Sequence, residues 1–156
     1  MIVYLVRHGE CVFEEDNRVL TGNGRENARK TREYLDKICS GNIETFTSTL
    51  ARSIESGAGN KQLEYLNEYS RSKEDFGEFI ARVRYCIDQL EKSDIEIVVI
   101  HGHSIYFSAL ISIIAGANPE KLKDLAFRFD YCSISKLEYN KDHWKVLKVN
   151  DISHLY

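Results

Sequence analysis

Two segments far apart in the sequence, Ile2–Val6 and Ile95–Ile100, consist mostly of apolar residues, many of them β-branched. Neither has the three- to four-residue spacing of a helix, nor the clean alternation of a strand with one wet face. Such runs are typical of strands that are buried on both sides in a parallel sheet. The sequence therefore predicts an α/β fold, a three-layer sandwich in which a mostly parallel central sheet is covered by helices on both faces.

Helical spacing and helix breakers account for much of the remaining chain. Thr21 is placed to cap a first helix that ends before Gly41. A long apolar stripe predicts a helix over Glu74–Lys92, and Ser72 with Asp75 resembles a capping pair before it. The other expected elements are a strand over Glu44–Thr47, helices over Leu50–Ser56, over Ser104–Ala115 and from Asn118 onward, and an antiparallel hairpin of Ser133–Tyr139 and Trp144–Val149.

Composition excludes several classes of protein. A length of 156 residues predicts a single domain, residues 1–156, and a net charge of −3 argues against a nucleic-acid partner. No apolar run reaches the roughly 20 residues of a membrane span, so no membrane partner is expected. The four cysteines form no Cys-x-x-Cys pair and nothing indicates secretion, which predicts reduced thiols and a cytoplasmic protein.

The two apolar segments end alike, in His-Gly: VYLVRHGE at 3–10 and IVVIHGHS at 97–104. If both strands are parallel in one sheet, His8 and His101 emerge at the same rim, with Arg7 beside them. Arg52 lies near the start of a predicted helix at that rim, where the helix dipole also favours anions. The natural guest of such a pocket is a phosphoryl group, since guanidinium groups grip its oxygens. Neighbouring cations would keep an imidazole neutral and able to attack phosphorus, and a carboxylic acid should protonate the leaving oxygen.

Six segments in order resemble the histidine phosphatase superfamily, the group that includes the cofactor-dependent phosphoglycerate mutases. The segments are LVRHGE at 5–10, LTGNGRENA at 20–28, STLARSIES at 48–56, EDFGEFIARV at 74–83, VVIHGHS at 98–104 and NDISHL at 150–155. The resemblance implies a phosphoglycerate mutase-like fold and a metal-independent phosphatase that needs no cofactor. It implies that His8 is the nucleophile that becomes phosphorylated. The phosphoryl group would be bound by Arg7, Arg52, His101 and the backbone N–H of Gly102.

The resemblance also implies a proton donor in a Leu-x-Glu segment after the second arginine. Leu66-Asn67-Glu68 fits this pattern, which makes Glu68 the first choice and leaves Glu64 as a rival. The other branch of the family has an aspartate after its second histidine, but this chain has Gly102 there.

The chain departs from the family pattern after Arg-His-Gly-Glu. Cys11 and Glu14 stand where Ser or Thr and then Asn are common. Three alternatives stay open: Glu14 faces solvent, Asn17 takes over the phosphate contact, or the pocket binds phosphate less tightly. His103 is expected to line the rim or pack under the following helix. A metal pair with His101 is disfavoured because further ligands are lacking and the arginines repel cations.

The segment between Glu68 and the helix expected from Glu74 is short, whereas larger members of the family have a lid there. An open site of this kind resembles the small phosphohistidine protein phosphatases. The expected substrate is a phosphorylated small molecule or a phosphoprotein, cleaved as a phosphomonoester or phosphoramidate. Two alternatives stay open: a catalytically weak module that binds phospho-ligands, and a phosphoglycerate mutase.

Overall fold

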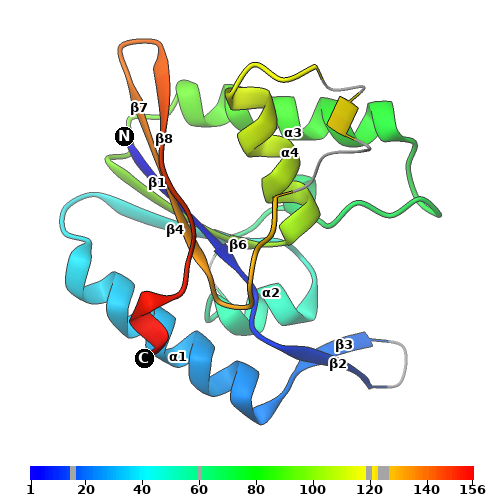
Figure 1. Cartoon of the computed structure of the whole chain (residues 1–156), viewed down its shortest axis with the longest axis vertical. Coiled ribbons are helices and arrows are strands. Elements are labelled where there is room, and N and C mark those ends of the chain that lie inside the picture. Colours follow the sequence, from blue (N-terminus) through cyan, green and yellow to red (C-terminus); the bar gives the residue numbers. More distant parts are fainter. Residues whose placement is uncertain (15–16, 60, 119–120, 123–126) are drawn as a thin grey trace.

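The computed structural model describes residues 1–14, 17–59, 61–118, 121–122 and 127–156. Its centre is a six-stranded sheet with the strand order β5-β4-β6-β1-β7-β8 (Figure 1). The strands of this sheet are β1 (Ile2–Arg7), β4 (Ile43–Thr47), β5 (Lys61–Gln62), β6 (Ile97–Gly102), β7 (Ile134–Asn140) and β8 (His143–Asp151). The helices are α1 (Gly22–Ile38), α2 (Ala51–Ser56), α3 (Phe76–Glu91) and α4 (Ser104–Ile114), with short 3-10 turns η1 (Glu64–Leu66) and η3 (Ser153–Leu155).

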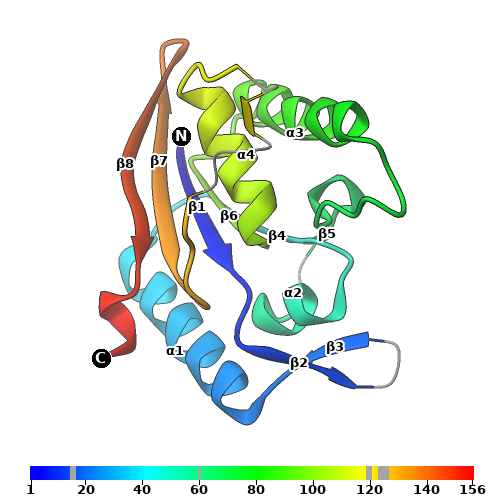
Figure 2. The same cartoon turned by 45° about the vertical axis from the view of Figure 1, so that its right-hand side comes forward.

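The sheet is mostly parallel, as predicted. Strands β5, β4, β6 and β1 run parallel, β7 is antiparallel to β1, and β8 is antiparallel to β7. Helix α1 covers one face, and α3 and α4 cover the other (Figures 1 and 2). The expected three-layer α/β architecture is therefore present in the described residues.

The pleat of β1 shows how the apolar runs build this sandwich. Val3 and Leu5 are fully buried and belong to the cluster that α3 and α4 complete. Tyr4 and Val6 point the other way and pack with Leu35 of α1. A strand with both faces covered needs apolar residues at consecutive positions, which is why no alternation is visible in the sequence.

Local side-chain chemistry sets the helix starts. Thr21 accepts a hydrogen bond from the Gly24 N–H and caps α1, as predicted. Helix α3 begins two residues later than expected, because Asp75 is its N-cap and forms a capping box with Glu78. Ser72 is not part of this cap; its hydroxyl bonds to Ser70.

Two further features differ from or extend the expectations. A hairpin of β2 (Cys11–Glu14) and β3 (Asn17–Leu20) follows β1 and was not predicted. The helix expected from Asn118 falls largely on positions 119–120 and 123–126, which lie outside the described residues.

The four cysteine thiols are free. Among the described helices, none combines the length and the apolar character that crossing a bilayer requires.

Candidate active site

The candidate site lies where β1, β6 and β4 end at one rim of the sheet. In the parallel register, Val6 pairs with His101 and Arg7 with Gly102. His8 follows directly, and its backbone N–H donates to the Gly102 carbonyl at 3.0 Å. The segment after β4 leads into α2 at the same rim, so residues from three distant parts of the chain converge here.

His8 is buried, and its two ring nitrogens have partners of opposite kind. Nδ1 lies 2.8 Å from the Gly9 carbonyl oxygen, and Nε2 lies 3.2 Å from Nε of Arg52. A carbonyl can only accept and a guanidinium can only donate, so these contacts fit a neutral ring with its proton on Nδ1. The lone pair is then on Nε2, beside Arg52. Burial, and after it the charges of Arg52 and Arg7, lower the pKa of His8 to about 3, although the bond to Gly9 opposes the shift.

Arg52 connects this histidine to an acid. Its side chain is only 6% exposed, and its Nη2 donates to Oε2 of Glu68 at 2.6 Å. Helix α2, which carries Arg52, is tied to the rim because the Ser56 hydroxyl donates to the Arg52 carbonyl and accepts from the Gly9 N–H. His8, Arg52 and Glu68 therefore form one chain of contacts.

The loop that carries Glu68 is held by Arg82 of α3. Nη1 of Arg82 donates to the carbonyls of Tyr65 and Asn67, at 2.9 and 2.6 Å. The same guanidinium forms an ion pair with Glu74. Of the two rival acids, Glu68 is half-buried and contacts Arg52, whereas Glu64 is exposed at the start of η1. Arg82 was not singled out from the sequence; its role is visible only once the loop's carbonyls are seen to converge on it.

Arg7 lies beside His8 under an aromatic ring. Its guanidinium donates to the Phe129 carbonyl and lies 4.0 Å from the centroid of the Tyr131 ring. That ring is in turn 5.8 Å from the ring of His8. The buried Nε of Arg7 has no hydrogen-bond partner among the described residues. Tyr131 carried no signal in the sequence, because it lies in an irregular segment before β7.

The imidazole nearest to His8 belongs to His103. The two ring centroids are 5.2 Å apart, and Nε2 of His103 lies 2.7 Å from the Ser48 hydroxyl. Burial, followed by the charge of Arg52, lowers the pKa of His103 to about 2. Its Nδ1 is buried without a partner in the described part of the chain. His103 therefore occupies the position that the sequence assigned to His101.

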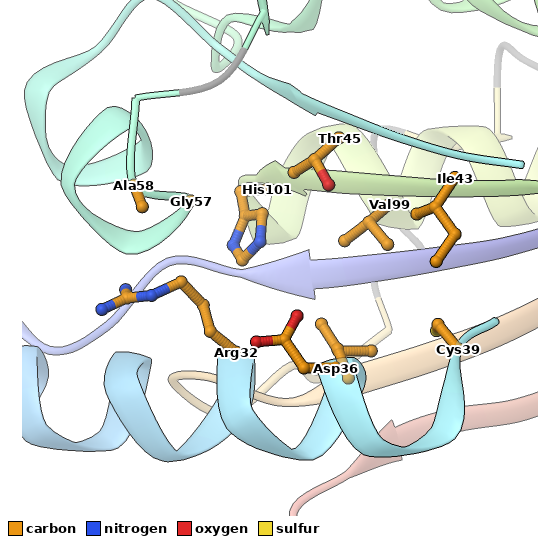
Figure 3. Close-up of a pocket in the computed structure, with 10 residues that line it drawn as sticks. Arg32, Asp36, Cys39, Ile43, Thr45, Gly57, Ala58, Val99 and His101 are labelled. Carbon is orange, nitrogen blue, oxygen red and sulfur yellow. The ribbon is translucent and has the colours of Figure 1, made fainter. Parts of the chain in front are cut away.

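The structure does not bring the His101 ring to this site. Val99 and His101 project from the face of β6 that α1 covers, and the His101 ring points toward Arg32 and Asp36 (Figure 3). The reason is the pleat: His8 lies two positions beyond Val6, which pairs with His101, so the residue opposite His8 is number 103. A signal was present in the His-Gly-His spacing, but only the strand register selects between the two histidines.

Gly102, Asn17 and Glu14 are the remaining residues that the sequence singled out near the site. Gly102 is required by packing, since a Cβ there would lie 2.9 Å from a ring carbon of Phe107. Asn17 and Glu14 pair with each other in the exposed β2–β3 hairpin, and Oδ1 of Asn17 accepts from the Arg18 N–H. The Glu14 side chain is thus at the surface rather than in the rim. Over the described residues, no group of three or more His, Cys, Asp or Glu side chains is arranged to hold a metal ion.

Comparisons with known proteins agree with this fold. The family model described as histidine phosphatase superfamily (branch 1) matches residues 58–152. No curated protein sequence matches the chain significantly. Solved structures do match: a phosphoserine phosphatase mutant from Entamoeba histolytica in complex with phosphoserine has a TM-score of 0.81 at 12% identity, and 99% of each chain is covered.

Two other solved structures match nearly as much of the chain. A putative alpha-ribazole-5'-P phosphatase from Escherichia coli has a TM-score of 0.82 at 20% identity, with 97% of each chain covered. A mycobacterial glucosyl-3-phosphoglycerate phosphatase has a TM-score of 0.76 at 15% identity, over 96% of this chain and 98% of that one. At these identities the likeness establishes the fold, which is the phosphoglycerate mutase-like α/β architecture.

Proposed function

The chain belongs to the histidine phosphatase superfamily, and on that premise we propose that it hydrolyses phosphate monoesters through a covalent phosphohistidine at His8. Family membership supports phosphatase activity in general. The observation that carries the specific proposal is the buried, neutral His8, whose Nε2 lone pair faces the Arg52 guanidinium. A neutral imidazole held beside a cation is a nucleophile placed where an anionic substrate binds.

In the first step, Nε2 of His8 attacks the phosphorus of the bound ester. The N–P bond forms as the bond from phosphorus to the leaving oxygen breaks, and Glu68 in its protonated form gives its proton to that oxygen. In the second step, a water molecule attacks the phosphohistidine, and the Glu68 carboxylate takes the proton from this water. Inorganic phosphate leaves, and both His8 and Glu68 return to their starting states.

The phosphoryl oxygens would be bound by Arg52, Arg7 and His103. Arg52 is at present paired with Glu68, so a bound phosphoryl group would compete for the guanidinium and release the carboxyl group to accept a proton. Arg7 has a buried Nε without a partner among the described residues, which a phosphoryl oxygen would satisfy. A contact from Asn17 requires its side chain to leave the Arg18 N–H.

The substrate is proposed to be a phosphorylated small molecule or a phosphoprotein side chain. The structural neighbours are phosphatases named for phosphoserine, alpha-ribazole phosphate and glucosyl-3-phosphoglycerate. Only the segment from Asn67 to Asp75 separates η1 from α3, which leaves no room for a lid domain between them. A mutase must shield its phosphoenzyme from water, so the absence of a lid between η1 and α3 favours hydrolysis over phosphoryl return.

A panel of phosphomonoesters and phosphohistidine peptides tests the proposal, with p-nitrophenyl phosphate as the reference substrate. We expect turnover that is unchanged by a chelator, because the proposed steps use no metal. Rapid quenching at alkaline pH should trap a phosphorylated protein whose label is lost in acid, as expected of an N–P bond. Turnover that disappears with the chelator, or a label on a residue other than His8, would contradict the mechanism.

One observation favours the binding module as a second candidate. The Arg52–Glu68 ion pair occupies the guanidinium that a phosphoryl group needs. If this pair stays closed, the site would bind phospho-ligands weakly and turn them over slowly. Binding of the panel compounds without hydrolysis of any of them would support this alternative.

A further inference from the structure

A cavity lies behind the sheet, on the face that α1 covers. It has a volume of about 340 Å³, which falls within the range of small-molecule sites, about 300–1,000 Å³. Val99 and His101 of β6 form its floor, Leu35 and Ile43 its apolar walls, and Arg32 and Asp36 of α1 face it (Figure 3). The proposed mechanism uses none of these six residues.

The floor of the cavity contains a polar group without a partner. The side chain of His101 is 2% exposed, and its Nδ1 is buried with no hydrogen-bond partner among the described residues. Buried polar atoms are nearly always satisfied by protein, water or ligand. His101 is a lining residue of the cavity, so its unpartnered nitrogen is a polar group that a guest on the α1 side of the sheet would satisfy.

Arg32 and Asp36 define the charge of that guest. They are four residues apart on one helix face, a spacing at which opposite charges can reach each other, yet they form no ion pair with each other in the described structure. Nη1 of Arg32 instead donates to the Ser56 carbonyl at 2.8 Å. Figure 3 shows the Arg32 guanidinium directed toward Gly57 and Ala58, whereas the Asp36 carboxylate is directed toward His101. The cavity thus offers a separated cation and anion.

We propose that this cavity binds a small zwitterion, namely a free α-amino acid with an apolar side chain. Its carboxylate would pair with Arg32, and its ammonium group would pair with Asp36 and donate to the unpartnered Nδ1 of His101. Its side chain would lie against Leu35 and Ile43. A simple anion such as phosphate would be repelled by Asp36, and a simple amine by Arg32. The proposal is independent of the phosphatase activity, because binding can be measured without turnover.

Isothermal titration calorimetry on the full chain tests the site with L-leucine and L-phenylalanine as probes. Two compounds serve as matched controls for leucine: 4-methylpentanoate lacks the ammonium group and 3-methylbutylamine lacks the carboxylate. We expect leucine or phenylalanine to bind at least about tenfold more tightly than either control, since each control leaves one charged group unmatched. Absence of binding by both amino acids at millimolar concentration, or binding of a control as tight as that of leucine, would overturn the proposal.

Two variants place the binding in the protein. Asp36→Asn changes an exposed side chain and should weaken leucine binding about tenfold or more, while Asp88→Asn, an exposed acid on α3, should leave it unchanged. In long-range ¹H–¹⁵N spectra, saturation with leucine should shift the ring nitrogens of His101 but not those of the exposed His143 on β8. Equal binding by Asp36→Asn and wild type, or unmoved His101 resonances at saturation, would show that the ligand binds elsewhere and contradict the proposal.

Discussion

The end of β6 presents two histidines that are two residues apart and differ in almost everything except burial. His103 faces the rim, lies 5.2 Å from the ring of His8 and bonds to Ser48. His101 faces α1, lines a cavity and has an unpartnered Nδ1. Both rings are held neutral chiefly by burial, which lowers the pKa of His103 to about 2 and that of His101 to about 3.

The comparison shows that a motif does not by itself specify which of its side chains works. Burial and a lowered pKa are shared by both histidines, so neither property identifies the active one. The two histidines differ in the side chains that surround them. His103 is surrounded by the groups proposed to act on phosphate. At His101, Arg32 is the one charge among the described residues that adds to the effect of burial. The neighbours of a titratable group therefore carry more functional information than its pKa.

The largest expected effect tests the rim side as a whole. His8→Ala should lower hydrolysis of p-nitrophenyl phosphate at least about 10³-fold, because no other described imidazole bonds to Arg52. The measurement is steady-state release of p-nitrophenol. His143→Ala on β8 is the matched control and should keep full activity. A wild-type rate from the His8 variant would show that the residues at this rim do not carry out the hydrolysis.

The second prediction separates the two histidines directly. His103→Asn should reduce kcat about 10²–10³-fold, as expected when one donor to a developing charge is lost, whereas His101→Asn should leave kcat close to the wild-type value. Near-UV circular dichroism checks that both variants keep their tertiary structure. The reverse ranking, with His101 the sensitive position, would restore the assignment made from the sequence motif.

The architecture and most of the residues at the rim of the sheet could be predicted from the sequence. The apolar run Ile2–Val6 predicted a strand buried on both faces, because its residues pack against helices on both sides of the sheet and must all be apolar. His8 and Arg7 were also within reach of the sequence, since they lie where β1 ends. Arg52 was too, since it lies near the start of the helix that follows β4. These features depend on order along the chain and on local pattern.

Features that depend on register or on tertiary contact were out of reach. The choice of His103 over His101 needs the offset between β1 and β6, which no local pattern encodes. The β2–β3 hairpin carried no signal because Val12 and Phe13 are exposed, 51% and 72%, and give no buried face. The pairing of Glu68 with Arg52 needs the loop to be held by Arg82, which is distant in sequence.

The third prediction concerns that loop. Glu68→Gln should lower kcat for phenyl phosphate about 10²-fold, in line with the loss of a general acid. The loss should be smaller for p-nitrophenyl phosphate, whose leaving group needs less help from a proton. Glu64→Gln, the control, should behave like wild type with both substrates because Glu64 is exposed and does not contact Arg52 in the structure. Equal losses from both variants with both substrates would argue against a proton donor at either position.

The smallest expected effect concerns His101 in the cavity and is measured as a change in the free energy of unfolding rather than in activity. The pKa of His101 is lowered to about 3 in the folded protein, first by burial and then by Arg32, and it is about 6.5 in the unfolded chain. Below pH 6.5 the unfolded chain takes up a proton that the folded protein refuses, so this histidine costs stability as the pH falls, and costs nothing above that pH.

Between pH 7 and pH 5, the cost from His101 amounts to about 2 kcal/mol of unfolding free energy. His101→Leu removes this group, so the variant should lose about 2 kcal/mol less than wild type over the same interval, whatever its absolute stability. Urea unfolding at both pH values measures the difference. An identical loss in variant and wild type would mean that the His101 ring accepts a proton in the folded state, and therefore that water or a neighbouring acid reaches its nitrogens on the α1 side of the sheet.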